Sequence, residues 1–245
     1  AILNSVVADV IGINQPDFFD EIVNYDTNTN IRFNNANWVE VFEKTQQIGT
    51  DYVDSDIYGL DYSFAATYFS IGNTTNNSWY PMMIDGTWVN SQITAEFEVG
   101  AFALPAVSDP TNAEGKKNLS VKTGATLSVF NRSNKKDAAQ DYIEIFFRDE
   151  IYQKFVDFAK TPSVKETVKQ TDTLVNSIFD ENKYTFVEAY DSRMPRYFPL
   201  VSASEAVALM KGQITAQTVA DTLQNQVELN KVDWQEYTQL SHTKS

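Results

Sequence analysis

The ten residues from Trp79 to Trp88, WYPMMIDGTW, constrain the fold of this chain more than any other stretch. The apolar run from Tyr80 to Ile84 indicates a short buried strand that ends in a turn and leads into a helix. Gly86 can adopt a positive φ at that turn, and Thr87 is a candidate N-cap for a helix from about Trp88 to Phe97. Because ligands of open α/β sheets bind beyond the carboxyl ends of strands, this corner is a candidate binding site.

Trp88 supplies the chemistry expected at this corner. Its indole offers a flat apolar face and one N–H donor, which suits a ligand with apolar C–H faces and polar edges, such as a sugar ring. Asp85 lies three residues earlier and adds a carboxylate, so it is a second candidate ligand-binding residue. A core tryptophan that covers the end of the sheet is the alternative, and the local sequence does not decide between the two.

The charge balance argues against polyanionic partners. The chain has 33 acidic and 19 basic residues and a formal net charge of −14, and no cluster of Lys and Arg interrupts this excess. Nucleic-acid binding depends on cationic groups that neutralise phosphates, so we expect no nucleic-acid partner. Attraction to an anionic membrane surface is disfavoured for the same reason.

The residues needed for several kinds of chemistry are missing from the sequence. The chain contains no Cys, and its one His is His242 in the C-terminal tail. Disulfides, thiolate metal sites and Cys nucleophiles are therefore excluded, and His-based triads or zinc sites are not expected. The spacing of Asp54 and Asp56 resembles a calcium loop, but Ala65 occupies the position of the required Glu. We expect no metal and no cofactor, whereas carboxylate chemistry stays open.

The rest of the chain is rich in helical patterns and contains few strands, which indicates a mixed α/β or α+β fold. Helical spacing is expected in residues 1–24, 37–49, 63–71, 133–147, 149–161, 163–185, 202–211 and 215–227, and short strands in 99–104 and 119–130. The expected N-caps are Asn37, Ser133, Asp149, Thr215 and Ser202, the last in a capping box with Glu205, and the expected helix-ending glycines are Gly49, Gly72 and Gly212.

An ordered set of motifs between roughly residues 38 and 228 carries a resemblance to a known family. The motifs are Pro81–Trp88, Phe102–Pro105, Thr123–Ala125, Ser133–Lys136, Ala138-Ala139, Phe146-Phe147, Glu150–Phe158 with Pro162, and Gly212 to Leu223. In this order and spacing they resemble the type 1 extracellular solute-binding proteins of ABC importers, which include maltose- and multiple-sugar-binding proteins.

The resemblance implies a periplasmic-binding-protein-like (type II) α/β fold with two lobes around a cleft. Residues 1–112 would form the first part of the second, C-terminal lobe, and residues 166–245 would supply the C-terminal helices of that lobe. Residues 113–165 would belong to the first lobe. The N-terminal part of the family pattern is not found, so the chain is expected to be a fragment or one of two pieces.

The resemblance also implies site residues and a function. Trp88 would stack on a sugar, Gly124 with its neighbours would line the cleft, and Tyr197 or Phe198 would provide a second stacking ring. The chain would then be a monomeric, non-enzymatic sugar- or oligosaccharide-binding component that delivers its ligand to the membrane permease. It would act outside the cell, as a cell-surface lipoprotein or in the periplasm.

Two other functions remain open at this point. A glycosidase needs two carboxylates about 5–10 Å apart, and Asp85 could pair with Asp61, Glu188 or Asp191, although an acidic chain offers such pairs by chance. A binding protein for a non-sugar ligand, such as a peptide, polyamine or phosphodiester, is the other possibility. The acidic balance mildly favours a cationic ligand over an anionic one.

Overall fold

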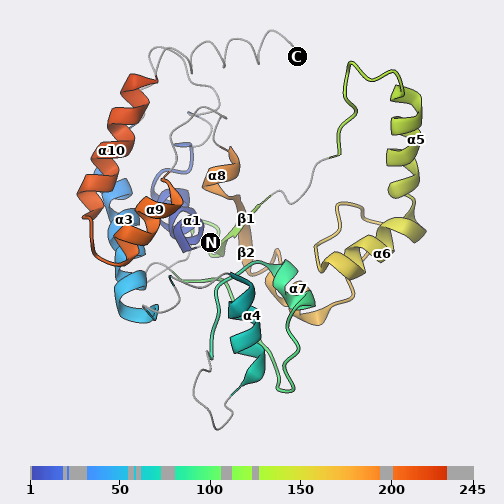
Figure 1. Ribbon diagram of the computed structural model, residues 1–245, viewed down its shortest axis with the longest axis horizontal. Helices are drawn as coiled ribbons and strands as arrows, with labels where there is room; N and C mark the ends of the chain where they lie inside the picture. The colour runs from blue at the N-terminus through green and yellow to red at the C-terminus, as the bar shows by residue number, and fades with distance from the viewer. Residues whose placement is uncertain are drawn as a thin grey trace. The chain divides into compact units, whose positions relative to one another are not determined.

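The computed structural model forms a mixed α/β structure, as the sequence predicts (Figure 1). It divides into two compact units: unit 1 comprises Ala1–Leu60, Ala103–Lys122 and Asn182–Ser245, and unit 2 comprises Asp61–Phe102 and Thr123–Glu181. The structure describes residues 2–18, 21, 32–54, 58, 62–72, 81–105, 112–122, 127–193 and 201–230, with only the backbone of 62, 63 and 193.

Unit 1 combines helices with a two-stranded parallel sheet. Strands β1 (Lys117–Val121) and β2 (Tyr184–Glu188) pair in parallel, with Lys117 opposite Tyr184 and Val121 opposite Glu188. Helix α1 (Ile2–Asn14) contacts β1, and the buried Asn118 side chain donates a hydrogen bond from Nδ2 to the Ala8 carbonyl at 2.7 Å. This bond satisfies a buried amide and fixes α1 on the sheet.

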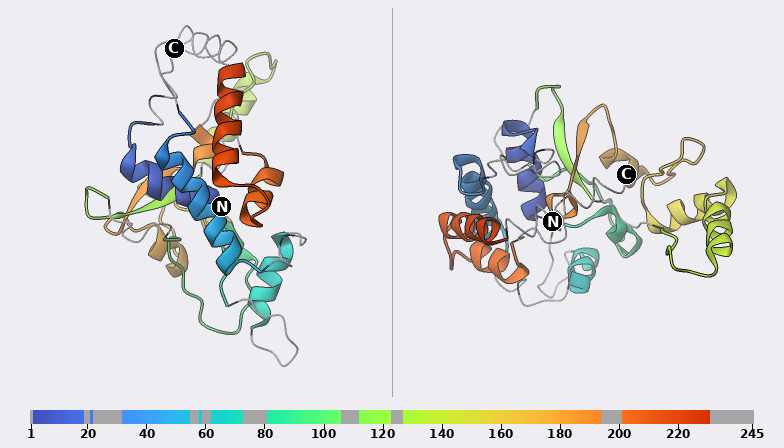
Figure 2. Two further views of the ribbon diagram at one scale, coloured as in Figure 1. Left: turned by 90° about the vertical axis from the view of Figure 1, so that its left-hand side faces the viewer. Right: turned by 90° about the horizontal axis from the view of Figure 1, so that it is seen from above.

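The hydrophobic core of unit 1 lies between α1, α3 (Ala36–Tyr52) and α10 (Ala216–Leu229), and Figures 1 and 2 show α3 and α10 side by side. Trp38 is fully buried at its centre, and its ring centroid lies 4.6–6.0 Å from those of four other aromatic rings, Phe18, Phe33, Phe42 and Tyr190. The helical spacing expected in residues 37–49 and 215–227 is confirmed, because α3 and α10 each bury one face, with Val41, Phe42, Thr45, Val219, Leu223 and Val227.

Two predicted helix caps in unit 1 are confirmed. Ser202 and Glu205 form the capping box of α9 (Ala203–Met210), and Thr215 caps α10 by accepting a hydrogen bond from the Thr218 N–H. The short helix α8 (Tyr190–Arg193) follows β2 directly. The caps at Ser202 and Thr215 involve only residues within one helical turn, which is why a local sequence signature could indicate them.

Two predictions for α3 are wrong. Asn35, not Asn37, is the N-cap, because its side chain accepts the Trp38 N–H at 3.0 Å. Gly49 does not end the helix, which continues to Tyr52. Instead Gly49 is buried against Met210 of α9, and a Cβ on Gly49 would lie only 2.4–2.6 Å from Met210 Cβ, Cα and O. The glycine therefore serves close helix packing rather than a turn.

Unit 2 contains α4 (Tyr62–Ile71), the 3₁₀ helix η2 (Thr87–Ser91), α5 (Lys136–Phe146), α6 (Asp149–Ala159) and α7 (Thr173–Ile178). Gly72 ends α4 with φ +66°, as predicted. A small core of Tyr152, Val156 and Val168 joins α6 to the segment that follows it. Lys165 connects this segment to the turn between α5 and α6, because its Nζ donates to the Phe147 carbonyl at 2.7 Å and to the Asp149 carboxylate.

Several predictions for unit 2 are wrong. The described residues 81–86, 99–104 and 127–130 form no strand, and their apolar side chains are largely exposed, as at Met82, Phe102 and Phe130. Without a partner strand, an apolar run cannot form the ladder that stabilises an extended backbone. The helix expected from Trp88 to Phe97 is only the short η2, and the pattern at 163–185 contains α7 and the beginning of β2 instead of one helix.

Helix α5 also departs from its prediction. No residue of its apolar face is fully buried: Phe146 packs against Tyr152 and Phe155 of α6, but Tyr142 is 64% exposed. Neither Ser133 nor Asp149 is an N-cap, because Lys135 and Arg148 occupy the cap positions of α5 and α6. Among the helices of the described ranges, none has the length and hydrophobicity that crossing a membrane requires.

Candidate functional site

Trp88 lies on η2 and exposes 53% of its surface, so it is not a core residue of unit 2. Its ring packs over the backbone of Gly86: a Cβ built on Gly86 would lie 2.0 Å from Cζ3 of the indole. Gly86 has φ −96° and ψ 169°, so the positive φ expected there is wrong. The glycine is needed for the close approach of the ring, which holds one face of the indole while much of its surface stays exposed.

Asp85 lies on the same turn and is half-buried. Its Oδ1 accepts the Gly86 N–H at 2.7 Å, and no other partner of its carboxylate is found among the described residues. Thr87 is the first residue of η2 and not its cap, since Gly86 holds the cap position without a side-chain hydrogen bond. Trp88 and Asp85 therefore place an aromatic surface and a carboxylate within one turn.

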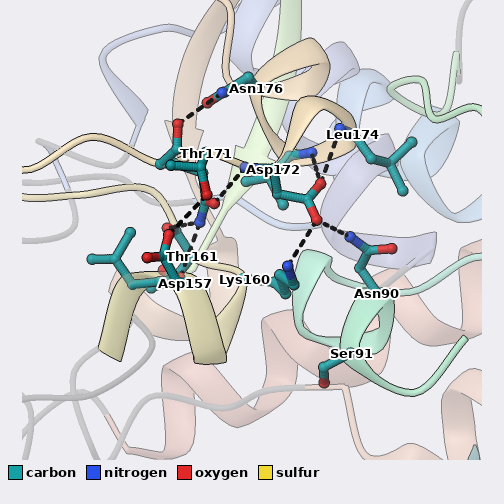
Figure 3. Close-up of polar contacts among 12 residues, drawn as sticks. Asn90, Ser91, Asp157, Lys160, Thr161, Thr171, Asp172, Leu174 and Asn176 are labelled. Carbon is teal, nitrogen blue, oxygen red and sulfur yellow. Dashed lines mark hydrogen bonds and ion pairs between the residues drawn. The ribbon is translucent and has the colours of Figure 1, made fainter. Parts of the chain in front are cut away.

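Asn90 anchors η2 to α7. Its Nδ2 donates to Oδ2 of Asp172 at 2.8 Å, and the same oxygen lies 3.0 Å from Nζ of Lys160 at the end of α6 (Figure 3). The other carboxylate oxygen of Asp172 caps α7 by accepting the N–H groups of Leu174 and Val175 at 3.0 and 3.1 Å. One side chain thus joins η2, α6 and α7 within unit 2.

The surroundings of Asp172 stabilise its charged form. Burial alone would raise the pKa of the carboxyl, but the hydrogen bonds from Val175 N–H, Lys160 and Leu174 N–H, together with the Lys160 charge, lower the pKa below its ordinary value. Gln170 adds further hydrogen bonds: its Oε1 accepts the Asp172 N–H at 2.8 Å, and its Nε2 donates to the Val156 and Thr161 carbonyls at 3.0 and 2.8 Å. The turn that carries Trp88 is therefore connected, through Asn90, to the hydrogen bonds and the ion pair around Asp172.

A groove of about 320 Å³ lies in unit 2 between α4 and the segment 92–97 that follows η2. The Thr94 N–H donates to Ser70 Oγ at 3.0 Å across it, and the Phe97 ring packs edge-on against Phe69 with 5.7 Å between centroids. Its lining includes the polar side chains of Thr67, Ser70, Gln92, Thr94 and Glu96 and the ring of Phe97. Gln92, which lines the groove, is the first residue after η2, so the groove lies close to Trp88 in the sequence.

The structure places two of the five predicted site residues together, Trp88 and Asp85. Gly124, Tyr197 and Phe198 lie outside the described residues, as do Asp56, Asp61 and His242. Asp191, one of the carboxylates considered for a glycosidase, is held in unit 1 by Lys122 at 2.8 Å and by Asn4 at 3.2 Å. Within the described ranges, no three His, Asp or Glu residues cluster as metal ligands.

Sequence reasoning missed Asn90, Lys160 and Asp172, as well as the groove. Asp172 carries a recognisable signal, because an Asp directly before an apolar helical run is a typical N-cap. The helical pattern over residues 163–185 hides this signal, because it predicts one helix that already contains Asp172. Asn90 and Lys160 have no such signal, since their roles depend on contacts with a residue that is distant in the sequence.

Comparisons with protein-family models, with curated proteins and with solved structures found no match to this chain. The site itself is an exposed indole and a carboxylate on a braced turn, beside a polar groove, which is an arrangement suited to binding a small polar molecule.

Proposed function

We propose that this chain is the substrate-binding component of an ABC importer, which binds a sugar or oligosaccharide and delivers it to a membrane permease. The observation that carries the proposal is Trp88, a large aromatic side chain that is half exposed yet held in place against Gly86. Transport, a type II periplasmic-binding-protein-like fold and a location outside the cell come from the resemblance to type 1 solute-binding proteins.

The physical basis for sugar binding is the combination of an apolar face with polar edges. The indole can cover the C–H face of a pyranose ring, and Asp85 has an oxygen available to accept a sugar hydroxyl. Because Gly86 and the Asn90–Asp172 hydrogen bond hold the turn, stacking requires little further ordering of the protein. Gly124, Tyr197 and Phe198 are proposed to complete the site, and the chain has no reaction of its own in this proposal.

Substitutions at Trp88 and Gly86 test the proposal. For the best ligand of a sugar panel, we expect Trp88→Ala to weaken binding by about 2 kcal/mol, roughly thirtyfold, because the stacking surface is lost. Gly86→Ala should weaken the same binding by about tenfold, because the new Cβ displaces the ring while the backbone conformation stays allowed. Isothermal titration calorimetry measures both effects.

Gly100→Ala is the matched control, since a Cβ there would meet no atom within 4 Å, and it should bind as the wild type does. Sugar binding that is equally strong in all four proteins would remove Trp88 from the site. If the wild type binds no sugar in the panel, the sugar assignment itself fails.

A further inference from the structure

The groove between α4 and residues 92–97 contains an exposed carboxylate, that of Glu96, which has no role in the proposed sugar site. We propose that it binds the ammonium group of a small primary amine. The observation is a polar groove whose only ionisable lining group, among the described residues, is the Glu96 carboxylate. This inference does not depend on the proposed function, because it concerns a different set of side chains.

The charge of the groove favours a cation. Glu96 is exposed and makes no ion pair or hydrogen bond with any described residue. The last turn of α4 contributes Ser70 and Ile71 to the lining, and the C-terminal end of a helix carries a partial negative charge. No Lys, Arg or His is among the described lining residues, so an anionic ligand would meet repulsion without compensation. The net charge of −14 adds long-range attraction for a cation.

The lining also offers the acceptors that an ammonium group needs. A primary ammonium donates three hydrogen bonds. The Glu96 carboxylate and the Gln92 carboxamide oxygen can accept two of them. Ser70 Oγ, which already accepts the Thr94 N–H at 3.0 Å, has a second lone pair for the third.

An aromatic ring completes the groove. Phe97 is 38% exposed, and its edge-on contact with Phe69 and close approach to Gly72 fix its position. The exposed part of the ring can contact the methylenes next to the amine and attract the cation. A volume of about 320 Å³ is at the lower end for small-molecule sites, so the occupant is a short-chain amine and not a peptide segment.

The test is calorimetric titration of the whole chain with 1,4-diaminobutane at 0.15 M salt. We expect saturable binding by the wild type, no binding of the neutral analogue 1,4-butanediol, and a Kd about tenfold higher in Glu96→Gln, which keeps the shape and removes the charge. Phe97→Leu should raise the Kd about threefold, because it keeps the apolar contact and removes the ring.

Glu98→Gln is the matched control, because Glu98 is exposed and lies two residues away but is not among the lining residues, and its Kd should equal that of the wild type. Equal weakening in Glu96→Gln and Glu98→Gln would mean non-specific attraction to an acidic chain and would overturn the inference. So would the absence of saturable diamine binding. Trp88→Ala should leave diamine binding unchanged, so failure of the sugar proposal and failure of this inference are distinguishable.

Discussion

Gly49→Ala should lower the free energy of unfolding by about 2–3 kcal/mol, the largest effect we expect from a single methyl group in this chain. The added Cβ would lie 2.4 Å from Met210 Cβ and 2.6 Å from Met210 Cα and O, so α3 and α9 would have to separate. Alanine would otherwise favour the helix by about 1 kcal/mol, and the stated loss already includes this gain. Urea unfolding followed by circular dichroism measures the change.

Two further variants make this prediction specific. Met210→Ala should not rescue Gly49→Ala, because the overlap involves the backbone and Cβ of Met210 rather than the end of its side chain. Gly100→Ala, with open space around its Cβ, should be within about 0.5 kcal/mol of the wild type. A Gly49→Ala chain as stable as the wild type would show that α3 and α9 do not pack this closely.

Asp172→Ala should destabilise the chain by about 2 kcal/mol, because it removes the N-cap of α7, the partner of Lys160 and the anchor of Asn90 together. Asp172→Asn keeps a capping oxygen and loses only the charge, so it should cost about 0.5 kcal/mol, since Lys160 is partly exposed to solvent. The same urea experiment measures both variants. Native-state hydrogen exchange at the Leu174 and Val175 amides should show faster exchange in Asp172→Ala.

The pH dependence of Asp172 follows from its lowered pKa. A carboxyl whose pKa is lower in the folded protein contributes stability above its unfolded-state pKa, and this contribution is lost as the pH falls through the folded-state pKa. The stability difference between the wild type and Asp172→Asn should therefore persist at pH 7, begin to fall near the ordinary aspartate pKa of about 4, and vanish only when the pH is below the lowered folded-state pKa. In the hydrogen-exchange experiment described above, unchanged protection of the Leu174 and Val175 amides in Asp172→Ala would contradict the capping role of Asp172.

The sequence predicted best those features that depend on neighbouring residues. The buried face of α3 repeats with the helical period, so Trp38, Val41 and Phe42 could be assigned to the core without knowledge of their partners. The caps at Ser202 and Thr215 are likewise set within four residues of the chain. The local signals have exceptions, since Asn35, Lys135 and Arg148 occupy the cap positions predicted for Asn37, Ser133 and Asp149.

The larger errors concern features that depend on partners far away in the sequence. The strand β2 was missed because its pairing with β1 joins residues more than 60 positions apart, whereas the runs at 81–86 and 99–104 resemble strands but have no described partner. Gly49 was assigned to a helix end because its contact with Met210 is invisible in the sequence. At the site, Trp88 was found by its residue type, but the role of Gly86 and the anchor at Asp172 required the structure.

Protection of Trp88 by a bound sugar is the most direct measure of the central claim. Acrylamide quenching of tryptophan fluorescence should fall when the ligand saturates the wild type, because, of the two tryptophans that the structure describes, Trp88 is 53% exposed and Trp38 is fully buried. In Trp88→Phe, where a ring remains but the indole is gone, the same sugar should leave the quenching unchanged. A sugar that binds the wild type without reducing its quenching would contradict the account, because the ligand would then not cover Trp88.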